Sequence, residues 1–172
     1  MGRITFILGG ARSGKSTYAL KIAKDIGGRV AFIATCQPKD YEMKRRIILH
    51  KGSRPRHWKT FQMPLEPTSL LKEVGSKFDV VLIDCLTLML SNLMLKGFKE
   101  SAIENKINKM LSVLKKIKSL SIIVSNEVGL GIVPENKLAR NFRDIVGRIN
   151  QSVAAKSDGV FFMVCGIPWR IK

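Results

Sequence analysis

Acidic residues are scarce in this chain of 172 residues: 13 Asp and Glu stand against 30 Lys and Arg, which gives a formal net charge of +17. Such an excess of positive charge attracts anions, so nucleic acids and nucleoside triphosphates are both candidate partners. Trp and Tyr are also scarce, with two of each. RNA-binding modules stack bases on aromatic side chains, and the basic residues here are spread along the chain. We therefore expect no nucleic-acid partner and keep a basic RNA-binding module as an alternative.

Cysteine is limited to Cys36, Cys85 and Cys165, which lie far apart in the sequence. Their spacing matches no metal-binding motif, and an odd number argues against a framework of disulfides. Each has apolar neighbours, which favours buried thiols in a reducing compartment. We therefore expect a cytoplasmic protein.

Long hydrophobic runs are absent as well. The longest apolar stretch, VVLIDCLTLMLSNLML at residues 80–95, is interrupted by Asp84, Ser91 and Asn92, and it is too short to span a bilayer comfortably. It predicts a buried strand followed by a packed helix, without stable insertion into a membrane. The N-terminal residues MGRITFILGG lack the layout of a signal peptide, because their apolar run is short and no small-residue cleavage site follows.

Apolar runs of strand length alternate with longer helical patterns, which is typical of a parallel sheet covered by helices. The length fits one domain, residues 1–172. We expect five or six strands, the clearest at residues 3–8, 29–34, 78–84, 120–125 and 160–166. We expect helices at residues 16–25, 39–50, 101–118 and 135–156. In the last of these helices, one face should consist of Leu138, Phe142, Ile145 and Ile149.

The octapeptide GGARSGKS, residues 9–16, matches the phosphate-binding pattern G-x-x-x-x-G-K-[ST] in full, between a predicted strand and a predicted helix. Gly9 and Gly14 permit backbone geometries that a side chain would forbid, so the N–H groups of the loop can turn toward phosphate oxygens. Lys15 would reach the β- and γ-phosphates, and the Ser16 hydroxyl would ligate Mg²⁺. The alternative is a glycine-rich turn that binds nothing. The remaining residues of this candidate nucleotide-binding loop are Gly10, Ala11, Arg12 and Ser13.

A second Mg²⁺ ligand is expected at the end of a neighbouring apolar strand. The stretch VVLID places Asp84 there, and a cation partner would offset the cost of burying its charge. Alternatively, Asp84 is the N-cap of the helix that follows. The guanine-reading motif N-K-x-D of GTPases is absent. These residues indicate a P-loop protein that uses a nucleotide, without showing whether it is a small-molecule kinase or an ATPase motor.

Both histidines of the chain, His50 and His57, lie in the basic stretch RRIILHKGSRPRHW at residues 45–58. A neutral imidazole can attack the α-phosphorus of a nucleoside triphosphate, so that pyrophosphate leaves and a phosphoramidate remains for a second acceptor. Such a site needs positive charge around the triphosphate, which Lys51 and Arg54 would supply. Nearby cations also favour the neutral imidazole. The alternative is that both histidines are surface residues on a basic helix and loop.

Several stretches of the chain together resemble one family. They are GGARSGKS (9–16), FIATC (32–36), EMKRRIILHKGSRPRHWKT (42–60), DCLTLMLSNL (84–93), VSNEVGLGIVPENKLARNFRDIVGRINQSVAA (124–155) and CGIPWRIK (165–172). The family is the bifunctional adenosylcobinamide kinase / adenosylcobinamide-phosphate guanylyltransferase of cobalamin biosynthesis, and the similarity runs nearly from end to end. Its most specific part is VSNEVGLGIVPEN, which other P-loop kinases do not carry.

The resemblance implies a RecA-like P-loop NTPase fold of three layers, with a mostly parallel central sheet, and a homotrimer. It implies phosphorylation of adenosylcobinamide by ATP or GTP. Transfer of GMP from GTP to adenosylcobinamide phosphate would follow, giving adenosylcobinamide-GDP and pyrophosphate. The GMP would pass through a covalent adduct on the histidine that matches His50, whereas His57 matches no such role. The nucleotide contacts that carry over are Gly9 to Ser16, Ala34, Thr35, Cys36, Lys51, Gly52, Ser53 and Arg54.

Two further contacts are acidic in the relatives. Gln62 stands at one of them and can bond a guanine edge without supplying a negative charge, and Asp84 stands at the other with a shorter side chain. Glu127 lies near two glycines at a predicted strand end, so it either faces the substrate or closes a turn with its carboxylate satisfied. Two functional alternatives stay open: a P-loop kinase for another small molecule with His50 incidental, and an enzyme that retains only the guanylyltransferase reaction.

Overall fold

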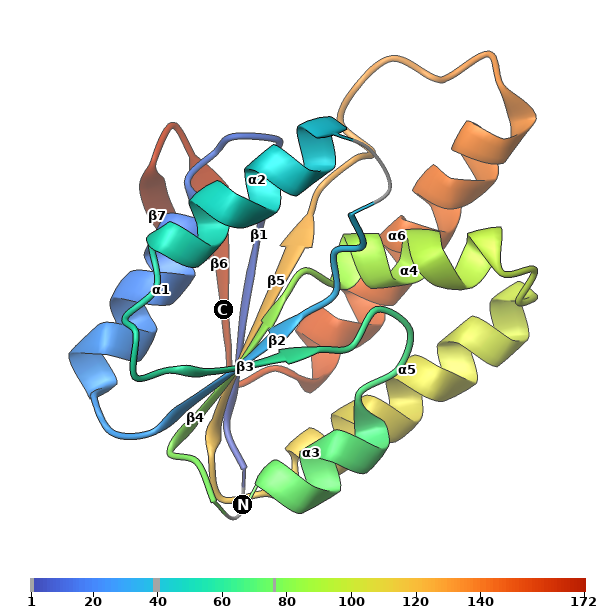
Figure 1. Ribbon diagram of the computed structural model, residues 1–172. Helices are drawn as coiled ribbons and strands as arrows, with labels where there is room; N and C mark the ends of the chain where they lie inside the picture. The colour runs from blue at the N-terminus through green and yellow to red at the C-terminus, as the bar shows by residue number, and fades with distance from the viewer. Residues whose placement is uncertain (1, 39–40, 76) are drawn as a thin grey trace.

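A computed structural model describes residues 2–38, 41–75 and 77–172, and for Met43, Arg46 and His50 it describes the backbone alone. These residues form a seven-stranded sheet in the order β3-β2-β4-β5-β1-β6-β7. Strand β7 runs antiparallel to β6, whereas the other neighbouring strands are parallel. Helices lie on both faces of the sheet (Figure 1). The expected three-layer α/β architecture with a mostly parallel sheet is therefore confirmed.

The bounds of the elements follow the sequence patterns closely. The strands are β1 (Ile4–Gly9), β2 (Val30–Ala34), β3 (Lys59–Gln62), β4 (Val80–Asp84), β5 (Leu120–Asn126), β6 (Gly159–Val164) and β7 (Ile167–Arg170). The helices are α1 (Lys15–Ile26), α2 (Tyr41–Gly52), α3 (Thr68–Val74), α4 (Leu86–Leu95), α5 (Glu100–Leu114) and α6 (Lys137–Lys156). The first two residues of the helix predicted at 39–50 lie outside the described residues.

The prediction of five or six strands is wrong, because the sheet has seven. The two unpredicted strands, β3 and β7, are four residues long and form the two edges of the sheet. Their sequences, KTFQ and IPWR, are almost wholly exposed and show no alternation of apolar and polar residues. A short edge strand that buries little gives no periodic signal in the sequence. The short helix α3 was not predicted either.

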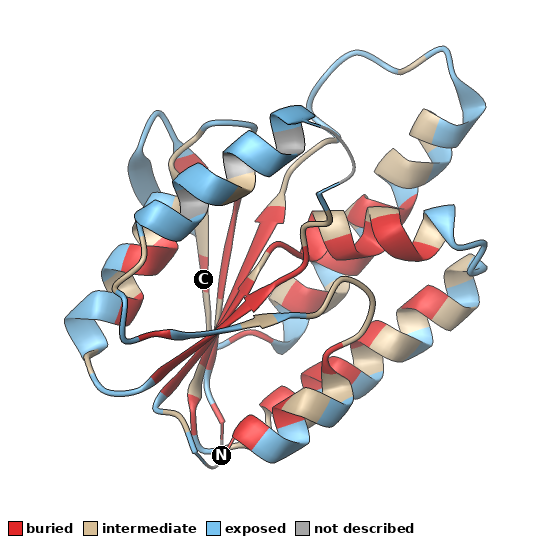
Figure 2. Ribbon diagram, in the orientation of Figure 1, coloured by how far each residue is buried: buried red, intermediate tan, exposed pale blue. Residues whose placement is uncertain are grey.

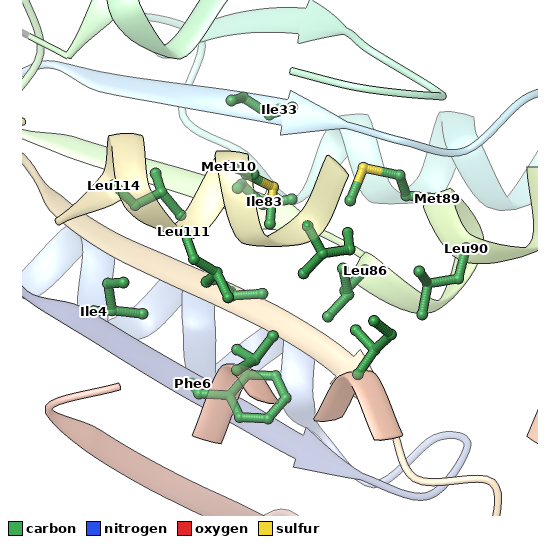
Figure 3. Close-up of a cluster of buried hydrophobic side chains, with 14 of the residues drawn as sticks. Ile4, Phe6, Ile33, Ile83, Leu86, Met89, Leu90, Met110, Leu111 and Leu114 are labelled. Atoms are coloured by element: carbon green, nitrogen blue, oxygen red, sulfur yellow. The ribbon is translucent and has the colours of Figure 1, made fainter. Parts of the chain in front are cut away.

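Two hydrophobic clusters fill the layers on either side of the sheet. The larger one packs α3, α4, α5 and α6 against one face, and the smaller one packs α1 against the other. Buried residues follow the central strands along their length (Figure 2). In the larger cluster, Ile83 of β4 lies near Met110 and Leu111 of α5 and Leu86 of α4 (Figure 3). Because both faces of β1, β2, β4 and β5 are covered, these strands read as continuous apolar runs.

The apolar face predicted for the last helix is only partly correct. Ile145 and Ile149 of α6 are buried, Phe142 is half-buried, and Leu138 is exposed. Leu138 lies in the first turn of α6, which follows an exposed segment at residues 129–133. The helix therefore reaches the core only after its first two turns.

The prediction that all three thiols are buried is also wrong. Cys85 is buried, Cys36 is partly buried, and Cys165 is exposed. Cys165 occupies the turn between β6 and β7, at the edge of the sheet, where its apolar sequence neighbours do not pack into the core. Within the described ranges, no helix combines the length and apolarity needed to cross a bilayer.

A carboxylate ties three segments together at the end of the sheet opposite the P-loop. Asp158 accepts hydrogen bonds from the Ile4 N–H at 2.7 Å and from the Lys115 ammonium at 2.8 Å. The bond to Lys115 and then the bond to Ile4 hold the pKa of Asp158 below its ordinary value of 3.8. Stability from this carboxylate is thus present above pH 3.8 and is lost as the pH falls through the lower folded-state pKa.

We predict that Asp158→Asn lowers the melting temperature at pH 7, because the charge on the acceptor is lost. The difference from the unmodified protein should shrink as the pH falls below 3.8, because the unfolded chain and then, at its lower pKa, the native carboxylate take up a proton. Calorimetry across this pH range measures both effects. Asp144→Asn is the control, since Asp144 is exposed and its ion pair is with the adjacent Arg143. An Asp158→Asn deficit that persists unchanged at pH 2.5 would contradict the electrostatic explanation.

Candidate functional site

The candidate site residues gather where the parallel strands end. Gly9, the last residue of β1, pairs in register with Asn126 of β5, and Asp84 of β4 pairs with Ala34 of β2. Ala34 also pairs with Gln62, the last residue of β3. Parallel strands direct their carboxyl ends to the same edge of the sheet. As the sequence predicted, the structure therefore brings together, at the carboxyl ends of the strands, the P-loop, the 34–36 segment, Gln62 and Asp84.

The P-loop requires glycine at both of its pattern positions. A Cβ on Gly9 would lie 2.6 Å from the Met163 carbonyl oxygen, and Gly9 has a φ of 152°. Gly14 has a φ of 93°, and a Cβ there would lie 3.0 Å from the Cα of Gly166. The Gly166 N–H also donates to the Ser13 carbonyl at 3.0 Å. The β6–β7 turn therefore supports the loop from outside.

Lys15 is held inside the loop, with 7% of its surface exposed. Its ammonium donates to the Gly10 carbonyl and lies 3.4 Å from the Ser13 hydroxyl. Burial lowers the pKa of Lys15, and proximity to Cys85 and Asp84 opposes that shift. Because burial raises the pKa of the Cys85 thiol to about 12, that thiol is neutral at pH 7. Asp84 thus supplies the negative charge felt by Lys15.

The alternative in which Asp84 is the helix N-cap is wrong. The N-cap of α4 is Cys85, one residue later. The carboxylate of Asp84 is partly buried, and its charge acts on two cations, Lys15 and Arg54. Its position fits an electrostatic role at the sheet edge.

Thr35 joins the ends of β2 and β4. It is fully buried, and its hydroxyl donates to the Cys85 carbonyl at 2.7 Å and accepts from the Cys85 N–H at 2.8 Å. Asn92 of α4 donates to the Thr35 carbonyl at 2.9 Å. The side chain of Thr35 thus fixes the position of Asp84, one residue before Cys85. The flanking Ala34 is buried, and Cys36 is partly exposed.

Arg54 anchors the turn that follows α2. Its guanidinium carbon lies 3.5 Å from the centroid of the buried Phe32 ring. Burial lowers the pKa of Arg54, and the charge of Asp84 opposes this shift. Its Nη1 is buried and has no hydrogen-bond partner among the residues the structure describes. A buried donor without a partner is costly, so this atom is suited to an oxygen of a bound anion.

A cavity of about 330 Å³ joins the P-loop helix to the same turn. Its walls are formed by Ser16, Thr17, Leu20, Lys21, Lys24, Asp25 and Ser53. Ser16 and Ser53 come from the two predicted nucleotide-binding segments, and the structure thereby brings these segments together. Lys51, Gly52 and Ser53 are exposed. Sequence reasoning missed Lys21 and Lys24, which the spacing of α1 places on the cavity side.

The two histidines of the basic stretch belong to different backbone segments. The backbone of His50 belongs to the last turns of α2, three residues before Ser53, and its side chain lies outside the described residues. His57 is exposed, while the neighbouring Trp58 is buried in the smaller hydrophobic cluster. Gln62, the residue expected to bond guanine, is exposed at the end of β3.

A buried polar network at the end of β5 was not predicted. The Thr87 hydroxyl of α4 accepts from the Asn126 N–H at 2.6 Å and lies 3.0 Å from the Ser125 hydroxyl. Ser125 donates to Asn150 of α6 at 2.8 Å, and Asn150 donates back to the Asn126 carbonyl at 3.1 Å. The available signal was a polar residue inside each of three apolar patterns, at positions 87, 125 and 150.

Glu127, directly after this network, closes a turn. Its carboxylate accepts from the Gly129 N–H at 2.7 Å, and its own N–H donates to the Gly9 carbonyl at 2.9 Å. The turn reading of the sequence is correct for this structure. The hydrogen bond from the Glu127 N–H to the Gly9 carbonyl places Glu127 beside the first glycine of the P-loop.

The fold and the loop together define a RecA-like, P-loop NTPase-like protein. A comparison with solved structures agrees: the RadB recombinase matches with a TM-score of 0.57 at 16% identity, covering 94% of this chain and 74% of that chain. At that identity the likeness shows the fold alone.

The family model described as "Cobinamide kinase / cobinamide phosphate guanyltransferase" matches residues 5–171, and the chain belongs to this family. The "Bifunctional adenosylcobalamin biosynthesis protein CobP" of Pseudomonas aeruginosa is 40% identical over 166 residues, covering 96% of this chain and 95% of the relative. The corresponding CobU proteins of Salmonella typhimurium and Escherichia coli are each 39% identical over 178 residues, covering 96% of this chain and 98% of each relative.

We predict that Arg54→Met separates stability from nucleotide binding. Removing a buried donor that has no partner, while keeping a long apolar side chain over Phe32, should change the free energy of unfolding by less than about 1 kcal/mol. The rise in melting temperature caused by a fixed, excess concentration of GTP and Mg²⁺ should become smaller, because the stabilisation of the folded state falls as the dissociation constant of the ligand rises. Differential scanning fluorimetry measures both. Arg56→Met, at an exposed neighbouring position, is the control, and an unchanged GTP-induced rise in Arg54→Met would refute the assignment.

Proposed function

We propose that this protein phosphorylates adenosylcobinamide with ATP or GTP and then transfers GMP from GTP to adenosylcobinamide phosphate, releasing pyrophosphate and adenosylcobinamide-GDP. The observation that carries the proposal is the family match over residues 5–171 in a chain whose P-loop is intact. The shared cavity between the P-loop helix and the turn after α2 supports it, because both reactions act on the phosphates of a nucleotide.

In the kinase reaction, the backbone N–H groups from Gly9 to Ser16 hold the phosphates at the N-terminal end of α1, where the helix dipole favours negative charge. The Lys15 ammonium leaves the Gly10 carbonyl for the β- and γ-phosphate oxygens. Since Lys15 is already desolvated, its charge acts strongly on the transferred group. The loop therefore stabilises the charge on the transferred phosphoryl group without a costly rearrangement during the reaction.

The residues at the sheet edge fit Mg²⁺, which prefers oxygen ligands and keeps several waters. The Ser16 hydroxyl and the Asp84 carboxylate would hold it, and when bound it would neutralise charge on the β- and γ-phosphates. Among the described residues no group of three or more His, Cys, Asp or Glu could hold a metal.

In the guanylyl transfer, the His50 imidazole attacks the α-phosphorus. A nitrogen–phosphorus bond forms, the bond to the β-phosphate oxygen breaks, and pyrophosphate leaves with the electron pair. Lys51, Gly52, Ser53 and Arg54 hold the triphosphate during this step. The phosphate of adenosylcobinamide phosphate then attacks the same phosphorus and releases the imidazole.

The remaining contacts concern the nucleoside and the assembly. Ala34, Thr35 and Cys36 at the end of β2 would border the nucleoside, and Gln62 would bond the guanine edge through its neutral amide. We also propose a homotrimer that acts in the cytoplasm and binds no nucleic acid. Binding to RNA with a steep salt dependence would favour the basic RNA-binding alternative instead.

We predict that incubation with α-labelled GTP transfers label to the protein, because GMP becomes bonded to an imidazole nitrogen. The label should be acid-labile and base-stable, absent in His50→Ala and present in His57→Ala, which is the matched control in the same basic stretch. Gel analysis after acid and base treatment measures this. Label that is still present in His50→Ala would show that His50 is not the nucleophile. ATP-dependent phosphorylation without any adduct would favour a kinase in which His50 is incidental.

We predict that Lys15→Ala lowers the turnover of adenosylcobinamide phosphorylation by about 10²-fold or more, the loss expected when a preorganised charge contact is removed. A coupled assay for nucleoside diphosphate release measures turnover. Lys109→Ala, an exposed lysine of α5, should retain full activity. Near-normal turnover in Lys15→Ala would refute the role of Lys15 in phosphoryl transfer.

A further inference from the structure

The end of β5 occupies a central place in the candidate site. In the sheet, β5 lies between β1, which ends in the P-loop, and β4, which ends at Asp84 (Figure 1). Glu127 is the first residue after β5, and its N–H donates to the Gly9 carbonyl at 2.9 Å. The backbone of Glu127 is therefore fixed beside the start of the P-loop.

The position of this strand end is held from two helices. Thr87 of α4 binds the Asn126 N–H, and Asn150 of α6 binds the Asn126 carbonyl. Thr87, Ser125 and Asn150 are all buried, and burying polar groups is costly unless they are hydrogen-bonded. Here the three side chains satisfy one another and the backbone. This network holds the backbone of Asn126 in place and thereby orients Glu127, the next residue.

The carboxylate of Glu127 belongs to a residue whose backbone is bonded to the P-loop. Among the described residues its hydrogen-bond partner is the Gly129 N–H at 2.7 Å, a local contact within a two-residue turn. The following segment exposes apolar side chains: Leu130, Ile132 and Val133 are 81%, 97% and 59% exposed. Along the chain, Glu127 thus stands between the strand end that is bonded to Gly9 and an exposed apolar segment.

Phosphoryl transfer to an alcohol needs a group that takes the proton of the attacking hydroxyl. The cations Lys15 and Arg54 cannot do so, and Asp84 is expected to hold Mg²⁺. Resting on the proposed function, we propose that Glu127 is this group: a catalytic base for the alcohol of adenosylcobinamide. The hydroxyl proton moves to the Glu127 carboxylate as the oxygen bonds to the γ-phosphorus. The bond from the γ-phosphorus to the β-phosphate oxygen breaks, and nucleoside diphosphate leaves with the electron pair.

A purely structural role for Glu127 predicts a different pattern. If the carboxylate only braced the turn beside Gly9, its loss would disturb the P-loop and would weaken both reactions together. A base for the acceptor alcohol acts only in the kinase reaction. Formation of the GMP adduct on the protein involves no alcohol, so it should not depend on Glu127.

The test compares Glu127→Gln with Glu135→Gln, a variant of an exposed carboxylate at the far end of the same connection. In Glu127→Gln, kcat for adenosylcobinamide phosphorylation should fall on the order of 10²-fold, within the range for general base catalysis. The KM for ATP, the rate of labelling by α-labelled GTP and the melting temperature should stay close to those of the unmodified protein. Glu135→Gln should match the unmodified protein throughout.

Two outcomes would overturn the proposal: unchanged kinase turnover in Glu127→Gln, or a parallel fall in turnover and in protein labelling. Failure of the proposed function would look different, because the unmodified protein would then form no adenosylcobinamide phosphate with ATP or GTP. That result would show that the alcohol of adenosylcobinamide is not the acceptor, and Glu127 could then not be its catalytic base.

Discussion

The parallel hydrogen-bonding register of β1, β5, β4 and β2 is the constraint on which the rest of the structure depends. It sets Gly9 beside Asn126 and Asp84 beside Ala34, so that four chain segments distant in sequence end at one edge. The parallel arrangement itself follows from burial, since the strands are apolar on both faces and such strands are stable between two layers of helices. Hydrophobic packing far from the phosphates thus determines where charged groups can meet.

Among the described residues, two cations lie close to the carboxylate of Asp84 at the carboxyl ends of the strands. Lys15 and Arg54 are both partly removed from water, and both are close enough to Asp84 to feel its charge. Two desolvated cations beside one carboxylate favour an incoming triphosphate, and the overall charge of +17 favours its approach. The desolvation cost is met on folding, which leaves the site preorganised for phosphoryl groups. The Thr35–Cys85 hydrogen bonds contribute by keeping Asp84 at a fixed distance from the loop.

Most of the fold could be predicted because the central strands are buried runs and the P-loop is a local pattern with a physical reason for each residue. Strands β3 and β7 escaped prediction because edge strands of four exposed residues carry no periodicity. The stacking of Arg54 on Phe32 depends on the path of the chain between them and has no local signature. The Thr87–Ser125–Asn150 network joins three segments and becomes visible only when they are packed. Glu127 was recognised as either a turn or a substrate-facing residue; the structure shows the turn, and the substrate-facing role is the one that we propose.

The contact between the β6–β7 turn and the P-loop has a consequence for synthesis of the chain. The P-loop is synthesised well before Gly166, whose N–H donates to the Ser13 carbonyl. Strand β6, which lines the outer side of β1, also comes late. A nascent chain that ends before these residues holds the whole phosphate-binding pattern without the backbone that shapes it. The backbone contact that supports the P-loop can therefore form only after the β6–β7 hairpin has been synthesised.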